Sequence, residues 1–209
     1  MTFQPIYVMR HGETVWNAEG RFQGALNSPL TDTGQGHAQQ LEATLSKLDL
    51  TQFDIRVSPQ GRAFETAAIA LSRQAMFLRT DDRLREIEVG EWSGQLRSEM
   101  STPGVVLEDT PDGPLAMYEH APGGEGFAKL RIRCTDFLNS LSAPTICVTH
   151  GITSRMLRTV ALGKPSSSLG DLPGGQGMVY VVENGNHRQL KKRGCRARPA
   201  SHKRRSSGD

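Results

Sequence analysis

Short runs of apolar, β-prone residues alternate along the chain with segments whose apolar residues recur at helical spacing. The apolar runs that predict strands lie at residues 6–9, 53–57, 146–149 and 178–182. The segments with helical spacing lie at residues 64–71, 127–141 and 152–162, with a further one that ends at Leu48. Strands that alternate with helices are typical of a mostly parallel sheet covered by helices on both faces. We therefore predict an α/β fold, a three-layer α-β-α sandwich.

The residues that flank these segments mark where several elements begin and end. Thr31-Asp32-Thr33 provides N-cap chemistry ahead of one apolar helix face, formed by Ala38, Leu41, Leu45 and Leu48. Gly163 and Pro165 end the helix that follows residue 151. Asn184-Gly185 predicts a hairpin turn toward residues 187–190. Residues 98–126 are rich in Gly, Pro and Asp, and we expect a loop-rich insertion there.

Composition favours one globular domain over residues 1–190. The chain has 209 residues, enough for one α/β domain with a sizeable core, and 36% of them are hydrophobic. No apolar run approaches the 20 or so residues that span a membrane, and residues 1–5 lack the basic region of a signal peptide. The three cysteines form no CxxC pair, and Cys134 and Cys147 fall on apolar faces as buried thiols would. We therefore expect a cytoplasmic location and no membrane partner.

The net charge of +3 conceals a strongly basic C-terminal segment. Residues 191–209 hold eight basic residues and one acidic residue, a net charge of +7, so residues 1–190 carry −4. This segment has no large apolar side chain to anchor it, and we expect a disordered, solvated tail. Electrostatic contact with nucleic acid is the functional alternative. The tail alone does not make nucleic acid an expected partner.

Chemistry-bearing residues follow three of the predicted strands. Arg10-His11-Gly12 follows the first strand, Arg62 lies just after the second, and His150-Gly151 follows the third. Ligands of open α/β sheets bind at the carboxyl ends of the strands. These ends can therefore bring two imidazoles and two guanidiniums together. Guanidinium groups offer forked donors to phosphate oxygens, so the pattern predicts a phosphate site.

The arrangement around these residues resembles the histidine phosphatase superfamily, the branch with cofactor-dependent phosphoglycerate mutases and small-molecule phosphatases. The resemblance covers roughly residues 5–182 and implies a phosphoglycerate mutase-like fold. It begins with Arg10-His11-Gly12-Glu13 and Asn17. It continues with Gly24, Leu30-Thr31-x-x-Gly34, Ser58-Pro59-x-x-Arg62-Ala63-x-x-Thr66-Ala67, Leu84-Arg85-Glu86, Gly90, Trp92, Gly94, Gly123-Gly124-Glu125 and Thr149-His150-Gly151. Gly126 stands where many relatives have serine, and residues 172–177 are unusually glycine-rich.

The resemblance also implies roles for individual residues. His11 would be the nucleophile and Glu86 the general acid and then base, with Arg10, Arg62 and His150 around the phosphate. A neutral imidazole can attack phosphorus and form a phosphohistidine that water later hydrolyses. The substrate-binding set implied is Arg10, Asn17, Gln23, Gly24, Arg62, Glu86, His150 and Gly151. Glu88 and Glu91 lie close to Glu86 in sequence, and a solvated acidic run is the alternative reading for all three.

Other phosphatase chemistries lack their motifs here. A cysteine phosphatase needs C-x5-R, but the residues six positions after the three cysteines are Ser140, Thr153 and Ser201. Neither a GxSxG elbow nor a GxxxxGK[ST] loop is present. His11 and His150 could bind a metal ion, but two neighbouring guanidiniums would repel it. We therefore expect neither a metal nor a cofactor.

The hypothesis that follows is a metal-independent phosphatase that hydrolyses phosphate monoesters of small metabolites. Only 64 positions separate Glu86 from His150, which is short for a mutase, whose longer insertion shelters the phosphohistidine from water. A cofactor-dependent phosphoglycerate mutase is the first alternative. An inactive relative that binds a partner through the basic tail is the second. The sequence does not indicate the physiological substrate or the oligomeric state.

Several other residues allow competing interpretations. Trp16 and Trp92 could line a substrate pocket or pack in the core. The remaining histidines show no partner pattern, and we expect them at the surface: His37, His120, His187 and His202.

Overall fold

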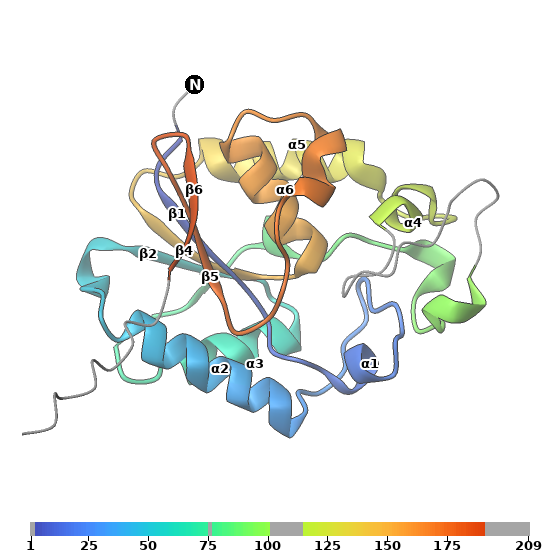
Figure 1. The fold of residues 1–209 in the computed structure, drawn as a ribbon, viewed down its shortest axis with the longest axis horizontal. Coiled ribbons are helices and arrows are strands. Elements are labelled where there is room, and N and C mark those ends of the chain that lie inside the picture. Colours follow the sequence, from blue (N-terminus) through green and yellow to red (C-terminus); the bar gives the residue numbers. More distant parts are fainter. Residues whose placement is uncertain (1–2, 75–76, 101–114, 191–209) are drawn as a thin grey trace, which may run out of the picture.

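Six strands form one sheet in the computed structural model, which describes residues 3–74, 77–100 and 115–190 (Figure 1). The strands are β1 (Ile6–Arg10), β2 (Asp54–Val57), β3 (Arg79–Thr80), β4 (Thr145–Thr149), β5 (Val179–Glu183) and β6 (Asn186–Leu190). Their order across the sheet is β3-β2-β4-β1-β5-β6. β1, β2, β3 and β4 pair in parallel, whereas β5 is antiparallel to both β1 and β6. The predicted mostly parallel sheet is therefore confirmed.

Helices cover both faces of this sheet (Figure 1). The α-helices are α1 (Val15–Ala18), α2 (Asp32–Leu45), α3 (Gly61–Ala70), α4 (Leu115–His120), α5 (Gly126–Asn139) and α6 (Gly151–Ala161). The 3₁₀ turns are η1 (Leu50–Gln52), η2 (Asp82–Leu84), η3 (Gly90–Trp92), η4 (Arg97–Glu99) and η5 (Ser166–Asp171). Successive strand residues point to opposite faces, so Val8 packs with α5 and α6 while Met9 packs with α2 and α3. The three-layer α-β-α sandwich follows.

Local signals in the sequence located most of the long elements. The Thr31 side chain accepts a hydrogen bond from the Gly34 amide and caps α2, as expected of an N-cap. The turn at Asn184-Gly185 has positive φ at both residues and joins β5 to β6. Leu48, predicted on the apolar face of α2, lies beyond the end of that helix.

Within the predicted loop-rich insertion at 98–126, the structure places α4 and the end of η4. The apolar spacing of the sequence did not predict α4, because this helix has only six residues and buries only two side chains, Met117 and Tyr118. Residues 101–114 of the insertion, and the basic segment 191–209 predicted to be disordered, lie outside the described residues.

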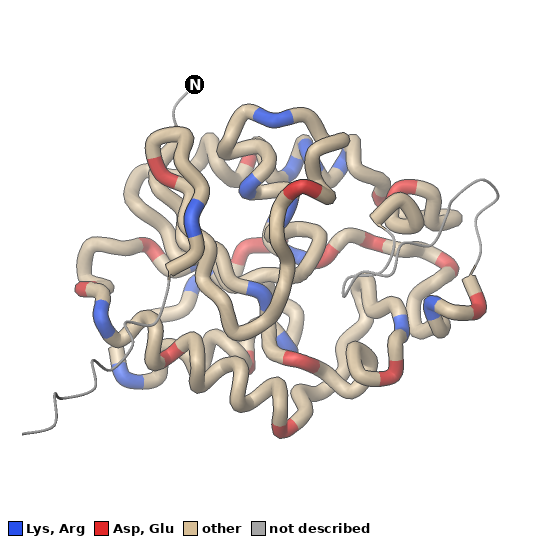
Figure 2. The backbone as a smooth tube through the Cα atoms, viewed as in Figure 1, with Lys and Arg blue, Asp and Glu red and all other residues tan. Residues whose placement is uncertain are grey.

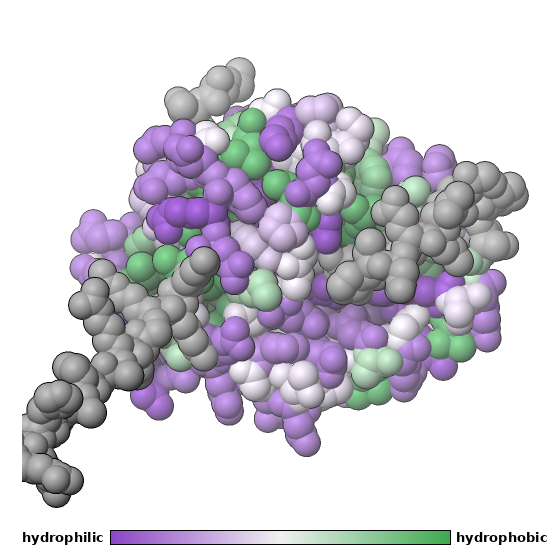
Figure 3. Space-filling model, viewed as in Figure 1, coloured by the Kyte–Doolittle hydropathy of each residue, from purple (hydrophilic) through white to green (hydrophobic). Residues whose placement is uncertain are grey.

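Polar residues cover most of the described surface on the face shown in Figure 3. Basic and acidic residues are interspersed along the backbone (Figure 2), and apolar residues form only small patches on the face seen in Figure 3. Phe77 is the most exposed of the large apolar side chains, at 78%. Across residues 3–74, 77–100 and 115–190, we find no helix with the length and apolar character needed to cross a membrane.

A close backbone contact fixes the loop that leaves β1. A Cβ added to Gly12 would lie 2.2 Å from the Gly34 carbonyl oxygen, and one added to Gly34 would lie 1.9 Å from the Glu13 carbonyl oxygen. The loop and the first turn of α2 therefore touch backbone to backbone. Any side chain at either glycine would push them apart.

We expect Gly34→Ala to lower the free energy of unfolding by about 1–3 kcal/mol, because overpacking against rigid backbone must displace the loop. Gly36→Ala is the matched control two residues along α2, where an added Cβ meets nothing within 4 Å. That substitution should raise stability by about 0.5–1 kcal/mol through helix propensity. Urea unfolding of both variants checks the pair, and equal effects would contradict the close contact.

Candidate active site

The carboxyl ends of β1 and β4 bring two histidines side by side. In the parallel register Arg10 pairs with Thr149, and the next residues are His11 and His150. The His11 amide donates to the Thr149 carbonyl at 2.9 Å, which continues the ladder by one bond. The two imidazole centroids lie 5.1 Å apart. The pairing of two strands far apart in the sequence therefore builds the centre of the site.

These strand ends border a small polar hollow, here called the active-site hollow. It is lined by Arg10, His11, Asn17, Gln23, Gly24, Arg62, Glu86, Arg97, Tyr118, Gly151 and Ile152. Every predicted site residue except His150 belongs to this set, and His150 is buried beside His11. The structure thus gathers the predicted residues in one place, while their roles stay predictions.

His11 is held as a neutral imidazole with a defined proton position. Its Nδ1 lies 2.7 Å from the Gly12 carbonyl oxygen. A carbonyl only accepts hydrogen bonds, so Nδ1 carries the proton and Nε2 keeps its lone pair. Burial, then Arg62 and Arg10, hold the pKa of His11 well below its usual value. His11 therefore presents a nucleophilic nitrogen at neutral pH.

His150 is oriented by a serine from the loop after β2. Its Nε2 lies 2.8 Å from Ser58 Oγ, and its Nδ1 is buried with no hydrogen-bond partner within the described ranges. Burial, followed by the charges of Arg62 and its neighbours, lowers the pKa of His150 well below its usual value. The ring is therefore neutral, and Nδ1 is its nitrogen without a hydrogen bond in the described residues.

Two guanidiniums give the active-site hollow a positive charge. Arg62, buried at the start of α3, donates from Nη1 to the Leu26 carbonyl at 2.6 Å and from Nη2 to the Gly24 carbonyl at 3.1 Å. Burial lowers the pKa of Arg62 to about 10, with the charge of Glu86 opposing that shift. The guanidinium of Arg10 lies over Gly151, where an added Cβ would be 3.4 Å from Cζ. Such a site favours an oxyanion ligand.

Glu86 lies at the amino end of α6. Its carboxylate accepts hydrogen bonds from the Ile152 amide at 3.2 Å and the Thr153 amide at 3.1 Å. Unpaired amides and the helix dipole make this a favourable place for an acidic group. Glu88 and Glu91 are exposed and do not line the active-site hollow. Among the three glutamates, Glu86 is therefore the one that faces the site.

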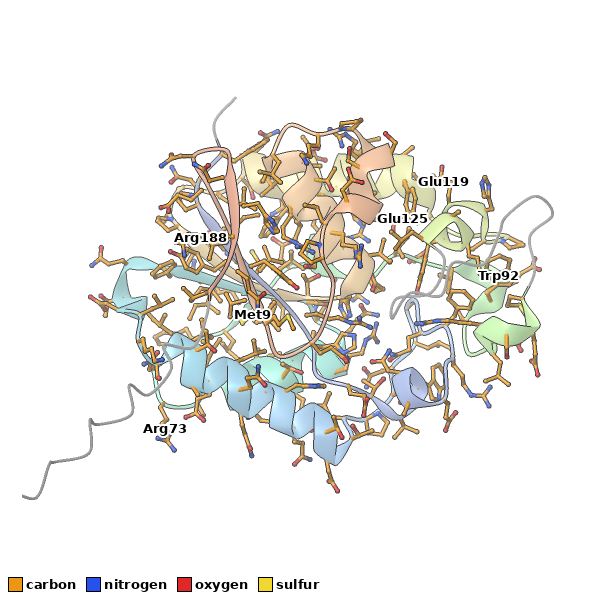
Figure 4. The ribbon with its side chains drawn as sticks, viewed as in Figure 1. Met9, Arg73, Trp92, Glu119, Glu125 and Arg188 are labelled. Carbon is orange, nitrogen blue, oxygen red and sulfur yellow. The ribbon has the colours of Figure 1, made fainter. Side chains whose placement is uncertain are left out.

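Sequence reasoning missed the aromatic and basic wall of the active-site hollow. Arg97 and Tyr118 line it, and both pack against Phe22, with Arg97 Cζ 5.4 Å from the ring centroid. Trp92 also stacks on Phe22, so its core interpretation is confirmed; it lies at the same end of the molecule as α4 (Figure 4). Arg97 lies just before the non-periodic segment 98–126, and Tyr118 lies within it. The basic character of Arg97 and the aromatic character of Tyr118 were the only features of the sequence that could have marked them as site residues.

The other histidines differ in their surroundings. His120 is exposed, as predicted. His37 and His187 also reach the surface but are half-buried. His37 accepts from the Glu13 amide at 3.4 Å, and His187 lies 3.2 Å from a guanidinium nitrogen of Arg158. His202 is outside the part of the chain that the structure describes.

The fold and its strand-end pairs of histidines and arginines agree with one protein family. Residues 6–194 match the histidine phosphatase superfamily (branch 1), and the chain belongs to this family. It is 33% identical over 171 residues to the probable phosphoglycerate mutase GpmB of Proteus mirabilis, a match that covers 77% of this chain and 76% of that protein.

Solved structures show the same fold. Bacillus stearothermophilus YhfR superposes with a TM-score of 0.72 at 29% identity, covering 90% of this chain and 96% of that one. A mycobacterial glucosyl-3-phosphoglycerate phosphatase in complex with VO3 superposes with a TM-score of 0.72 at 23% identity, covering 89% and 97%. The predicted superfamily and its phosphoglycerate mutase-like fold are therefore confirmed.

The lowered pKa values predict a pH dependence of stability. Below about pH 6.5, the ordinary histidine pKa, the unfolded chain takes up protons that folded His11 and His150 do not, so stability falls as pH falls. His11→Asn should reduce the slope of unfolding free energy against pH in that range by up to about 1.4 kcal/mol per pH unit. Urea unfolding at several pH values measures the slope. The exposed control His120→Asn should leave it unchanged, and an unchanged slope in His11→Asn would refute the neutral state.

Proposed function

We propose that the protein is a metal-independent phosphatase that hydrolyses small phosphate monoesters through a phosphohistidine on His11. The observation that carries this proposal is the hydrogen bond from His11 Nδ1 to the Gly12 carbonyl, which leaves Nε2 as the nucleophile in a hollow lined by Arg10 and Arg62. Family membership supports phosphoryl-transfer chemistry in general. Hydrolysis, rather than transfer to another acceptor, is the finer part of the proposal.

In the first step, His11 Nε2 attacks phosphorus while the bond from phosphorus to the ester oxygen breaks. Arg10, Arg62 and His150 Nδ1 would hold the equatorial oxygens, and each preorganised donor of this kind is typically worth about 3 kcal/mol of barrier. Protonated Glu86 gives its proton to the departing alkoxide, which leaves as an alcohol. In the second step, Glu86 takes a proton from water, the water oxygen bonds to phosphorus and the phosphohistidine bond breaks. Phosphate and the original enzyme result.

Phosphoglycerate mutase activity is the second candidate, because the 33% identical relative carries that probable activity in its name. The two reactions share the phosphohistidine and differ in the acceptor, which is water in one case and a second hydroxyl in the other. The third hypothesis, an inactive binding module, is disfavoured by the assembled His11, Arg62 and Glu86 set. We propose a small phosphorylated metabolite as substrate and the cytoplasm as location.

We expect the purified protein to release inorganic phosphate from p-nitrophenyl phosphate and 3-phosphoglycerate in EDTA. His11→Ala should reduce the rate by more than about a thousandfold, since removing a nucleophile from an enzyme removes most of its rate enhancement. Unfolding measurements on the variant establish that it folds. Acid-labile ³²P bound to the wild-type protein after reaction with a ³²P-labelled substrate, and absent from His11→Ala, would identify the intermediate. Activity that is lost in EDTA and returns only with a divalent ion would contradict the proposal.

A separate assay distinguishes the mutase. Isomerisation of 3-phosphoglycerate with 2,3-bisphosphoglycerate supplied, faster than phosphate release, would replace hydrolysis as the main activity. Phosphate release without isomerisation supports the phosphatase.

A further inference from the structure

A buried glutamine joins the two walls of the active-site hollow. Gln60, the N-cap residue of α3, is 5% exposed and does not itself line the hollow. Its side-chain Oε1 accepts from the Glu86 amide at 2.7 Å, and its Nε2 donates to the Gly24 carbonyl at 2.8 Å. Glu86 and Gly24 both line the hollow. The side-chain amide of Gln60 therefore connects Gly24 with Glu86, which lie 62 positions apart in the sequence.

The glutamine is firmly fixed at its own backbone. Its carbonyl accepts from the Ala63 and Phe64 amides at the first turn of α3, and its amide donates to Ser58 Oγ at 3.3 Å. The side chain thus extends from a rigid helix start. Because both ends of its amide group have complementary partners, the group has one satisfied orientation and loses both hydrogen bonds if flipped.

The segment around Glu86 depends on such side-chain partners because it belongs to no strand or α-helix. Thr149 Oγ1 donates to the Leu84 carbonyl at 2.6 Å, and Thr153 Oγ1 donates to the Arg85 carbonyl at 2.7 Å. Gln60 provides the partner of the Glu86 amide itself. Buried backbone polar groups need partners, so removing the glutamine would leave this amide to find a new position or water.

The same glutamine is coupled to the phosphate-binding arginine. The Gly24 carbonyl accepts from Gln60 Nε2 at 2.8 Å and from Arg62 Nη2 at 3.1 Å. Glu86 and Arg62 therefore share one link through Gln60 and Gly24. This link sets the position of the acid relative to the group that would hold the phosphoryl oxygens.

We propose that Gln60 is a positioning residue that holds Glu86 at the place where it protonates the leaving group. The inference rests on the proposed function, since it needs Glu86 to act as general acid. Its consequence is specific to the leaving group. p-Nitrophenolate departs as a stable anion and needs little protonation, whereas an alkoxide departs only with a proton. A misplaced acid would therefore impair alkyl phosphates more than p-nitrophenyl phosphate.

The test compares wild type with Gln60→Leu and Gln60→Met, which keep the side-chain size and remove both hydrogen bonds. General acid catalysis typically contributes about 10²–10⁴-fold, and losing part of it should lower kcat/KM, which reports the step in which the leaving group departs, at least about tenfold more for 3-phosphoglycerate than for p-nitrophenyl phosphate. Ser58→Ala is the matched comparison from the same loop. It removes the partner of His150, so it should slow both substrates by similar factors.

The outcomes separate this inference from the proposed function. If wild type hydrolyses both substrates and kcat/KM falls by the same factor for both in the Gln60 variants, the proposed function survives and the positioning role is overturned. If wild type releases no phosphate from either, both proposals fail. Amide hydrogen exchange provides a readout independent of turnover, since the Glu86 amide should exchange faster in either Gln60 variant. An unchanged exchange rate would also overturn the inference.

Discussion

The parallel pairing of β1 with β4 is the constraint on which the site depends. It aligns Arg10 with Thr149, so the two following histidines leave the sheet as neighbours, and the His11 amide continues the ladder to Thr149. Parallel strands need a crossover connection, and here the connection from β1 to β4 contains β2, β3 and the helices α1 to α5. The register of these two adjacent strand ends therefore depends on how the intervening elements pack. The chemistry is a consequence of that register.

The charges around these histidines form a second constraint. Two buried imidazoles beside Arg10 and Arg62 stay neutral because a further positive charge in that desolvated place is unfavourable. The lowered pKa values reduce the stability of the fold as the pH falls below about 6.5. At neutral pH they keep the imidazole of His11 unprotonated. In the proposed reaction, the phosphoryl group of the substrate supplies the negative charge that balances the two guanidiniums. Perturbed pKa values and a shared hollow are together typical of functional sites.

The supporting residues are as specific as those that face the hollow. Ser58 and Gln60, two residues apart, reach His150 and Glu86 respectively, while Arg62 follows on the first turn of α3. One strand-to-helix connection thus positions a buried histidine, a glutamate and an arginine of the candidate site. The backbone contact of Gly12 with Gly34 fixes the loop after β1 in a similar way. Precise placement here comes from short contacts that these side chains and glycines make with neighbouring segments.

The sequence alone determined the alternating α/β elements, the strand-end histidines and arginines, and the cap at Thr31, because each depends on local periodicity or on residues a few positions apart. It indicated Glu86 only through family resemblance, since nothing local separates Glu86 from Glu88 and Glu91. Only the tertiary structure decided that Glu86 meets the amino end of α6, that Arg97 and Tyr118 form a wall, and that Gln60 links Glu86 to Gly24. Those contacts join residues that no periodicity relates. They exist because packing the two helical layers onto one sheet brings distant loops to the same edge.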